Sequence, residues 1–377
     1  MSSAEHIDPR GRQRRVLVVS AGMGAGHHAA ADELVRRLRE RGHRAERIDV
    51  LELGRPGQGR RLRATYAFLL RRLPWAYGLA MRFWARWPAP LEALTARGAH
   101  AYEQGLLREV RRYEPDVVVS VFNLASQALG RLRASGRLTV PVATYVPDPG
   151  PHPYWVHPGV DLHLTVLPRT ARALESYGAR RVVVVPRVVR PRFERDGIRR
   201  ADARVRSGLP AEADIALVSG GSWTAGRVRR TATCLARSGG VIPVTLCGND
   251  SALRRRLTRR GAGVALGWTD DMATVMAAAD VLVDNAGGLT CSEALACGLP
   301  VILFRPLPGH GRLNAEALEA AGEAAYARCE AELISMVRSR GWRRPGALGA
   351  AGPPSGDAVT AIVDLSIPDL SRAAEAT

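Results

Sequence analysis

Short apolar runs alternate with amphipathic segments along most of the chain. Residues 16–20 read Val-Leu-Val-Val-Ser, which is typical of a buried strand, and residues 29–41 place apolar side chains on one helical stripe. A glycine-rich turn separates the two, and a second strand is expected over residues 47–53. Strand, helix and strand in this order predict a βαβ unit, the building block of a parallel sheet.

The same alternation continues in two series of similar size. Further strands are expected at 117–120, 142–146, 162–166 and 182–185, then at 215–219, 241–247, 264–268, 281–284 and 301–304. Helices are expected at 227–238, 271–278, 314–321 and 357–365. The pattern predicts an α/β protein of two facing Rossmann-like domains with parallel sheets and a cleft between them.

Domain boundaries follow from a change in composition. Residues 186–200 are rich in Arg and Pro and read as a linker. We therefore expect an N-terminal domain over residues 1–190 and a C-terminal domain over residues 200–337. Residues 338–377 are expected to form a flexible segment and a terminal helix that packs back on the N-terminal domain.

Composition narrows the possible partners. The chain has 377 residues, which suits two domains, and a formal net charge of +18. It contains no lysine, so every basic side chain that can pair with a phosphate is an arginine. Nucleic acid, phosphorylated substrates and anionic lipids all fit this charge. No nucleic-acid-binding motif is present, so we expect no nucleic-acid partner.

Cysteine usage and hydropathy bear on location. The five cysteines form no CxxC pair and no zinc-ligand spacing, which favours a reduced, cytoplasmic protein without a bound metal. The first 15 residues lack an apolar signal core, and no apolar run is long enough to span a membrane. Any contact with a membrane is therefore expected to be peripheral.

Small and polar residues follow the strands of the second series. A strand, a glycine-rich turn and a helix N-terminus form a ready phosphate site, and Glu293, one turn into its helix, could accept hydrogen bonds from a ribose. Because strand ends on one sheet edge converge, these motifs together predict a nucleotide-sugar site. Its expected residues are Gly220, Gly221, Ser222, Gly248, Asn249, Gly267, Trp268, Ala286, Gly287, Gly288, Thr290 and Glu293.

The glycine-rich turn of the first series is less specific. Gly22-Met-Gly24-Ala-Gly26 lacks the lysine of a phosphate-binding P-loop, which argues against an ATPase of that class. Asp49 lies where a dinucleotide enzyme places its ribose-binding acid, so this turn alone leaves an NAD enzyme open.

Residues 286–300 resemble the donor motif of the two-domain (GT-B) glycosyltransferases. The closest resemblance is to the monogalactosyl- and glucosyl-diacylglycerol synthases and to the N-acetylglucosaminyltransferase that makes lipid II. The resemblance implies that Gly287, Gly288 and Thr290 meet the phosphates of UDP and that Glu293 binds its ribose. His310 and Asn314 stand where these families carry a loop that faces the donor sugar, so the resemblance implies that both residues lie near that sugar. These families carry Gln and Glu where this chain has His310 and Gly311, which leaves the sugar open.

The first half resembles the diacylglycerol branch. Gly24-Ala-Gly26-His27 is similar to its Gly-Gly-Gly-His motif, and a second match covers Asp148, His152, Trp155 and His157. The resemblance implies an inverting transfer of a hexose or N-acetylhexosamine from a UDP-sugar to a lipid hydroxyl, with diacylglycerol as the expected acceptor. It assigns His27 as general base. No cofactor is expected beyond the UDP-sugar, which is a co-substrate.

The roles of the other matched residues stay open. Asp148 is expected to be a second base or to orient His27, and a simple turn aspartate is the alternative. His152 and His157 flank Trp155 without an obvious third metal ligand, so we assign them structural or acceptor-positioning roles. His27 itself could instead only cap its helix.

Residues 55–113 are rich in arginine and aromatic side chains. This mixture suits a membrane interface, where rings lie at headgroup depth and guanidinium groups meet anionic lipid. We expect this region to dock the protein on the inner face of the membrane, although its aromatics could instead fill the core of a helix pair. The residues expected there are Trp75, Trp84, Trp87, Arg82 and Arg86.

Three alternatives share the predicted architecture. One is a glycosyltransferase with a soluble natural-product acceptor, which would not need the aromatic and arginine region. A second is a sugar-nucleotide epimerase of the same fold, whose product would still carry UDP. The third is an inactive, membrane-bound nucleotide sensor.

Overall fold

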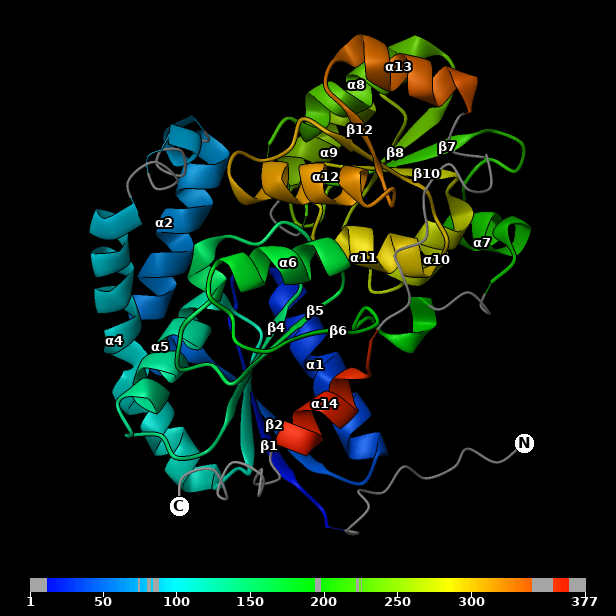
Figure 1. Ribbon diagram of the computed structural model, residues 1–377. Helices are drawn as coiled ribbons and strands as arrows, with labels where there is room; N and C mark the ends of the chain where they lie inside the picture. Colours follow the sequence, from blue (N-terminus) through cyan, green and yellow to red (C-terminus); the bar gives the residue numbers. More distant parts are fainter. Residues whose placement is uncertain are drawn as a thin grey trace, which may run out of the picture.

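Two parallel sheets of six strands each form the framework of the protein (Figure 1). The computed structural model describes residues 12–73, 75–79, 83, 88–193, 198–221, 224, 226–340 and 355–365. The strand orders are β2-β1-β3-β4-β5-β6 and β12-β11-β10-β7-β8-β9. All of their strand pairs are parallel. The predicted α/β architecture of two Rossmann-like domains is confirmed.

The strands of the N-terminal sheet alternate with helices. They are β1 (Arg15–Ser20), α1 (Ala25–Glu40), β2 (Arg44–Asp49), α2 (Gln58–Arg72), α4 (Pro88–Tyr113), β3 (Val117–Ser120), α5 (Asn123–Ala134), β4 (Val142–Val146), β5 (Leu162–Thr165), α6 (Pro168–Ser176) and β6 (Val182–Val184). The sheet reverses its strand order between β1 and β3, which places a ligand crevice outside the carboxyl ends of these strands.

The C-terminal domain repeats the plan with the strand order of a dinucleotide-binding fold. Its elements are α7 (Arg200–Ser207), β7 (Ile215–Val218), α8 (Val228–Ser238), β8 (Ile242–Leu246), α9 (Ser251–Arg259), β9 (Val264–Leu266), α10 (Met272–Ala278), β10 (Val281–Asp284), α11 (Leu289–Ala296), β11 (Val301–Phe304), α12 (His310–Ala320), β12 (Ala325–Ala327) and α13 (Glu330–Ser339). Here the order reverses between β7 and β10.

Three expected boundaries differ from the structure. The strand expected over 47–53 ends at Asp49, because its carboxylate accepts hydrogen bonds from the amides of Leu51 and Gly22 and turns the chain into a 3₁₀ helix, Val50–Glu52. The helix expected from residue 29 begins at Ala25, so His27 lies in its first turn. The helix expected over 314–321 is α12, which begins at His310.

The linker is packed into the core. One buried apolar cluster runs from the N-terminal sheet to the C-terminal sheet, and Val188 and Phe193 of the linker belong to it. Phe193 is fully buried in the 3₁₀ helix Pro191–Phe193. The segment expected to be a linker thus packs between the two domains.

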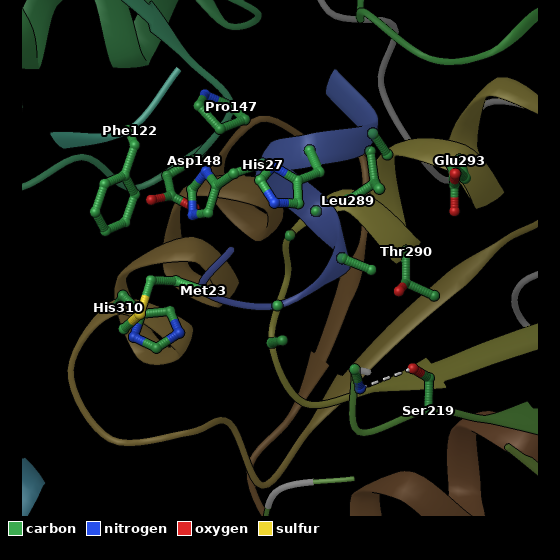
Figure 2. Close-up of a pocket in the computed structure, with 18 of the residues that line it drawn as sticks. Met23, His27, Phe122, Pro147, Asp148, Ser219, Leu289, Thr290, Glu293 and His310 are labelled. Carbon is green, nitrogen blue, oxygen red and sulfur yellow. Dashed lines mark hydrogen bonds between the residues drawn. The ribbon is translucent and has the colours of Figure 1, made fainter. Parts of the chain in front are cut away.

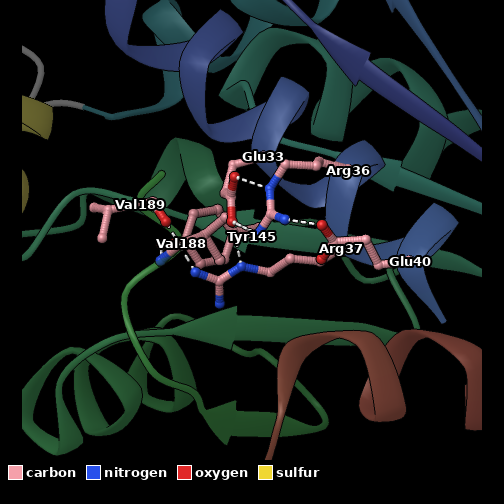
Figure 3. A network of polar contacts seen from close by, with 7 residues as sticks. All are labelled: Glu33, Arg36, Arg37, Glu40, Tyr145, Val188 and Val189. Atoms are coloured by element: carbon pink, nitrogen blue, oxygen red, sulfur yellow. Dashed lines mark hydrogen bonds and ion pairs between the residues drawn. The ribbon is translucent and has the colours of Figure 1, made fainter. Parts of the chain in front are cut away.

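A polar network fastens the linker to α1 (Figure 3). Glu33 is 1% exposed and accepts hydrogen bonds from Arg36 at 2.8 Å and from Arg37 at 2.6 Å. Arg37 also donates to the carbonyl oxygen of Val189 at 2.9 Å. Because α1 begins near His27, the network ties the position of that side chain to the linker.

Glu33→Ala is expected to lower the free energy of unfolding by about 1–2 kcal/mol, because two guanidinium groups lose their buried carboxylate partner. Calorimetric melting is the measurement. Glu40→Ala is the matched control on the same helix; its side chain is 59% exposed and pairs with Arg36 only at the surface, so a change within about 0.5 kcal/mol is expected. Equal losses in the two variants would contradict a special role for Glu33.

The described part of the tail returns to the N-terminal domain. Helix α14 (Ala358–Leu365) contacts α1 and β3 and lies beside α1 in Figure 1. Asp357 pairs with Arg41 of the α1 C-terminus, and the amide of Ser355 donates to the carbonyl of Val184 at 2.9 Å.

Candidate active site

A cavity of about 1150 Å³ lies between the two domains. Its walls include Met23 after β1, Asp148 after β4, Ser219 after β7 and Ala286 after β10. Both sheets therefore contribute the carboxyl ends of their strands, which is where open α/β sheets bind ligands. The volume is large enough for a nucleotide with a second molecule beside it.

His27 lies on the N-terminal side of this cavity (Figure 2). Its Nδ1 donates to the carbonyl oxygen of Val121 at 2.9 Å. Burial lowers the pKa of the imidazole, and the negative charge of Asp148 opposes this only in part. The ring is therefore neutral at neutral pH, with its proton on Nδ1 and a lone pair on Nε2 that can accept a proton.

Asp148 is held by two side chains other than His27. Trp155 donates from Nε1 to one carboxylate oxygen at 3.3 Å, and Asn314 donates to the other at 3.4 Å. Asp148 thus acts on His27 through its charge, and no hydrogen bond between the two is recorded. This charge effect was not among the roles expected for Asp148, and it can stabilise an imidazole that takes up a proton.

His152 and His157, which were expected at the site, contact neighbouring segments of the chain. His152 lines the cavity, and its Nε2 lies 3.3 Å from Nδ2 of Asn123; burial lowers its pKa to about 4. The Nδ1 of His157 accepts from the amide of Gly159 at 3.0 Å. Trp155 is fully buried beside them. Among the described residues, no group of three or more His, Cys, Asp or Glu side chains could hold a metal ion.

Glu293 lies on the opposite wall, in α11 (Figure 2). It is 5% exposed, and burial raises its pKa. Arg190 of the linker donates to its Oε1 at 2.9 Å, which favours the charged carboxylate. A carboxylate in this position could accept hydrogen bonds from the two hydroxyls of a ribose.

Two helix N-termini meet at the cavity. Helix α11 starts at Leu289 and α1 at Ala25, and a Cβ atom placed on Gly26 would lie 3.4 Å from the Cβ of Leu289. The first amides of a helix have no partner within the helix, and its dipole favours negative charge at this end. Thr290 lines the cavity here, so this wall suits a phosphate.

The remaining residues expected at the nucleotide divide into two groups. Gly221, Gly248, Gly267, Trp268, Ala286 and Gly288 line the cavity, as does Gly24 on the other side. Gly220, Asn249 and Gly287 do not line it, although each borders a residue that does. Ser222 lies outside the described residues.

Asn314 joins the two domains. It is fully buried; its Oδ1 accepts from the amide of Gly150 at 3.0 Å, and its Nδ2 donates to the carbonyl of Ala286 at 3.1 Å. With the bond to Asp148, the amide is engaged by protein groups on both sides of the cleft. Asn314 and His310 both line the cavity, so the donor-sugar contacts expected for them stay predictions.

An exposed apolar group lies on and after α2. Trp75 is 68% exposed, so it does not fill a core. Other large apolar side chains exposed in this region are Leu62, Phe68, Leu79 and Phe83. Trp84, Trp87, Arg82 and Arg86 lie outside the described residues. Within the described part of the chain, no helix combines the length and apolar character needed to cross a membrane.

Comparison with known proteins gives a separate match for each of the two domains that form the cavity. Residues 27–186 match the family described as monogalactosyldiacylglycerol (MGDG) synthase, and residues 215–337 match the glycosyltransferase family 28 C-terminal domain. The two matches follow one another along the chain, one in each domain. The resemblance inferred from the sequence motifs is confirmed, and the two domains meet at the cavity that contains His27 and Glu293.

Named relatives share these two domains at low identity. The chain is 24% identical over 238 residues to a processive diacylglycerol beta-glucosyltransferase of Bacillus pumilus, covering 60% of this chain and 61% of the relative. It is 28% identical over 324 residues to a probable monogalactosyldiacylglycerol synthase 2 of Oryza sativa, covering 78% and 67%. The chain thus spans about three fifths to two thirds of the length of these relatives.

Solved structures support the fold. MurG of Acinetobacter baumannii superposes with a TM-score of 0.52 at 17% identity, over 94% of this chain and 99% of that one. At this identity the similarity shows the two-domain glycosyltransferase fold alone.

Two contributors to the site had no signal in the sequence patterns. The sequence predicts only an arginine-rich linker around Arg190, whereas in the structure Arg190 pairs with Glu293. Tyr77 lies in the region of residues 55–113, which is rich in aromatic side chains, and it lines the cavity and contacts His310. Both reach the site through contacts between the domains, which strand-end motifs do not reveal.

Proposed function

We propose that this protein is an inverting glycosyltransferase that moves a hexose or N-acetylhexosamine from a UDP-sugar to the hydroxyl group of a lipid, with diacylglycerol as the acceptor. The observation that carries the proposal is the shared cavity. An imidazole with an available Nε2 lines it on one domain, and a helix N-terminus and the buried carboxylate of Glu293 line it on the other.

The chemistry of the two walls fits a single displacement. The acceptor oxygen attacks the anomeric carbon on the face opposite the diphosphate, and Nε2 of His27 takes the hydroxyl proton as the new bond forms. The bond between the sugar and the diphosphate breaks, and its electron pair leaves with UDP. The N-termini of α1 and α11 stabilise that negative charge, and one displacement inverts the anomeric configuration. Asp148 stabilises the imidazolium that forms.

Charge and exposed rings support a lipid acceptor. The net charge of +18 favours an anionic surface, and exposed Phe68, Trp75 and Phe83 suit the depth of lipid headgroups. We propose peripheral association with the inner face of the membrane through this region. Co-sedimentation with vesicles of anionic phospholipid tests it directly.

The decisive experiment is a screen of UDP-sugars against diacylglycerol and soluble acceptors, with product mass as the readout. A glycosylated lipid and free UDP are expected. A product that still bears UDP would identify an epimerase, and transfer only to soluble acceptors would overturn the lipid proposal. UDP binding without turnover on any acceptor would identify a nucleotide sensor.

Gly150→Ala is expected to lower transfer by about tenfold or more while UDP binding is retained. A Cβ atom there would lie 2.2 Å from the carbonyl carbon of Leu313, so the two domains could not approach as closely as they do. Gly98→Ala in α4 is the control, since a Cβ atom there meets nothing within 4 Å. Full activity of Gly150→Ala would show that catalysis does not need this close approach.

A further inference from the structure

The segment after α2 reaches across the cleft to the loop that precedes α12. Leu70 of α2 and Leu307 of the C-terminal domain form one buried apolar cluster. A Cβ atom at Gly78 would lie 2.7 Å from the Cβ of Pro308. Figure 1 shows the upper end of α2 beside this loop. The exposed apolar region is therefore in direct contact with the loop that leads into His310.

Two tyrosines continue this contact as a chain of hydrogen bonds. The hydroxyl of Tyr77 lies 3.2 Å from Nδ1 of His310, and the two rings meet edge to face with centroids 6.2 Å apart. Behind it, the ring of Tyr66 lies 5.7 Å from that of Tyr77, and a hydrogen bond joins the two side chains. Both tyrosines and the histidine line the cavity.

The protonation states of Tyr66, Tyr77 and His310 follow from their surroundings. Burial raises the pKa of Tyr66 and of Tyr77, and the charge of Asp148 acts in the same direction, so both phenols keep their protons. Burial lowers the pKa of His310 and outweighs the opposing effect of Asp148, so its ring is neutral. A neutral imidazole carries one proton, and the partner at Nδ1 decides which nitrogen holds it.

Tyr77 has one proton to donate. When its oxygen accepts the hydrogen bond from Tyr66, its own proton points to Nδ1 of His310. That nitrogen is then the acceptor, and the proton of the imidazole lies on Nε2. His310 would present this N–H to a ligand in the cavity as a hydrogen-bond donor.

We propose that Tyr77 is a positioning residue for donor-sugar recognition, holding His310 from across the domain boundary with its Nε2–H toward the sugar. This inference rests on the proposed function, since it assumes that a UDP-sugar occupies the cavity. If Tyr77 holds His310 in this way, discrimination among donor sugars depends on the position of the segment after α2, which belongs to the acceptor-facing domain.

The Tyr77→Phe variant removes the hydroxyl and keeps the ring. With UDP-glucose and UDP-galactose as donors, kcat/KM for the better donor is expected to fall about tenfold, and the preference between the two epimers to narrow. UDP affinity is expected to stay unchanged. His310→Ala should lower kcat/KM similarly, and the double variant should be no worse than His310→Ala alone, because the two residues act as a unit. Tyr177→Phe, on a 41% exposed side chain, is the control.

Nuclear magnetic resonance of ¹⁵N-histidine-labelled protein tests the proposal without turnover. The Nε2–H form of His310 is expected in the unmodified protein, and a mixture of both forms in Tyr77→Phe. An Nδ1–H form in the unmodified protein, or an unchanged epimer preference in Tyr77→Phe, would overturn the proposal. Absence of transfer from every UDP-sugar would instead overturn the proposed function, and the resonance measurement would still decide the role of Tyr77.

Discussion

Replacing His27 by alanine is expected to lower the rate of sugar transfer by about 10²–10⁴-fold, the range for loss of a general base. The acceptor hydroxyl is a poor nucleophile until its proton is taken, and the Nε2 of His27 is the group placed to take it. UDP affinity should be unchanged, because the walls assigned to the nucleotide belong mainly to the C-terminal domain. Steady-state kinetics and calorimetric titration with UDP measure the two quantities.

The pH dependence gives a second measure of the same role. A base must be neutral to act, and burial lowers the pKa of His27 from 6.5. The midpoint of the fall of kcat/KM on the acid side is therefore expected below pH 6.5. His100→Ala, at a side chain that is 68% exposed, is the control for removal of a histidine. Unchanged turnover in His27→Ala would contradict the assignment of His27 as general base. His27 would then be a residue that only positions its helix.

Replacing Glu293 by alanine is expected to weaken UDP binding by about 10–100-fold, the loss that corresponds to one hydrogen bond to a charged group at about 1.5–3 kcal/mol. The loss should appear in the KM for the donor more than in kcat, because the ribose does not change during the reaction. Burial raises the pKa of Glu293, so UDP affinity should also fall as the pH drops through that raised value and the carboxylate is protonated.

Two variants make the Glu293 result interpretable. Glu293→Gln keeps one oxygen acceptor and should fall between the unmodified protein and Glu293→Ala. Glu316→Ala removes a carboxylate that is 46% exposed and pairs with Arg312 on the surface of α12, so it should leave UDP affinity unchanged. Equal UDP affinity in the unmodified protein and in Glu293→Ala would show that the ribose is bound elsewhere. Melting temperatures separate this from a loss of folding caused by the unpaired Arg190.

Local patterns were enough to predict the sheets. Runs such as residues 16–20 and 301–304 are buried on both faces, and such strands read as uninterrupted apolar segments. Parallel strands place all of their carboxyl ends on one edge, so Gly221, Gly288 and Glu293 could be assigned to one side of a cleft from their positions after strands alone. Helix starts were placed less well, because turn conformations such as that at Gly309 depend on the fold.

The sequence by itself therefore determined the class of fold, the two domains and the residue types that a nucleotide-sugar site needs. Tertiary structure alone decided how these residues are used. Asn314 bridges the domains, Arg190 reaches Glu293 from the linker, and Tyr77 meets His310 from the opposite domain. Each of these contacts joins residues more than 100 positions apart, and no periodicity or short motif records which side chains the closed cleft brings together.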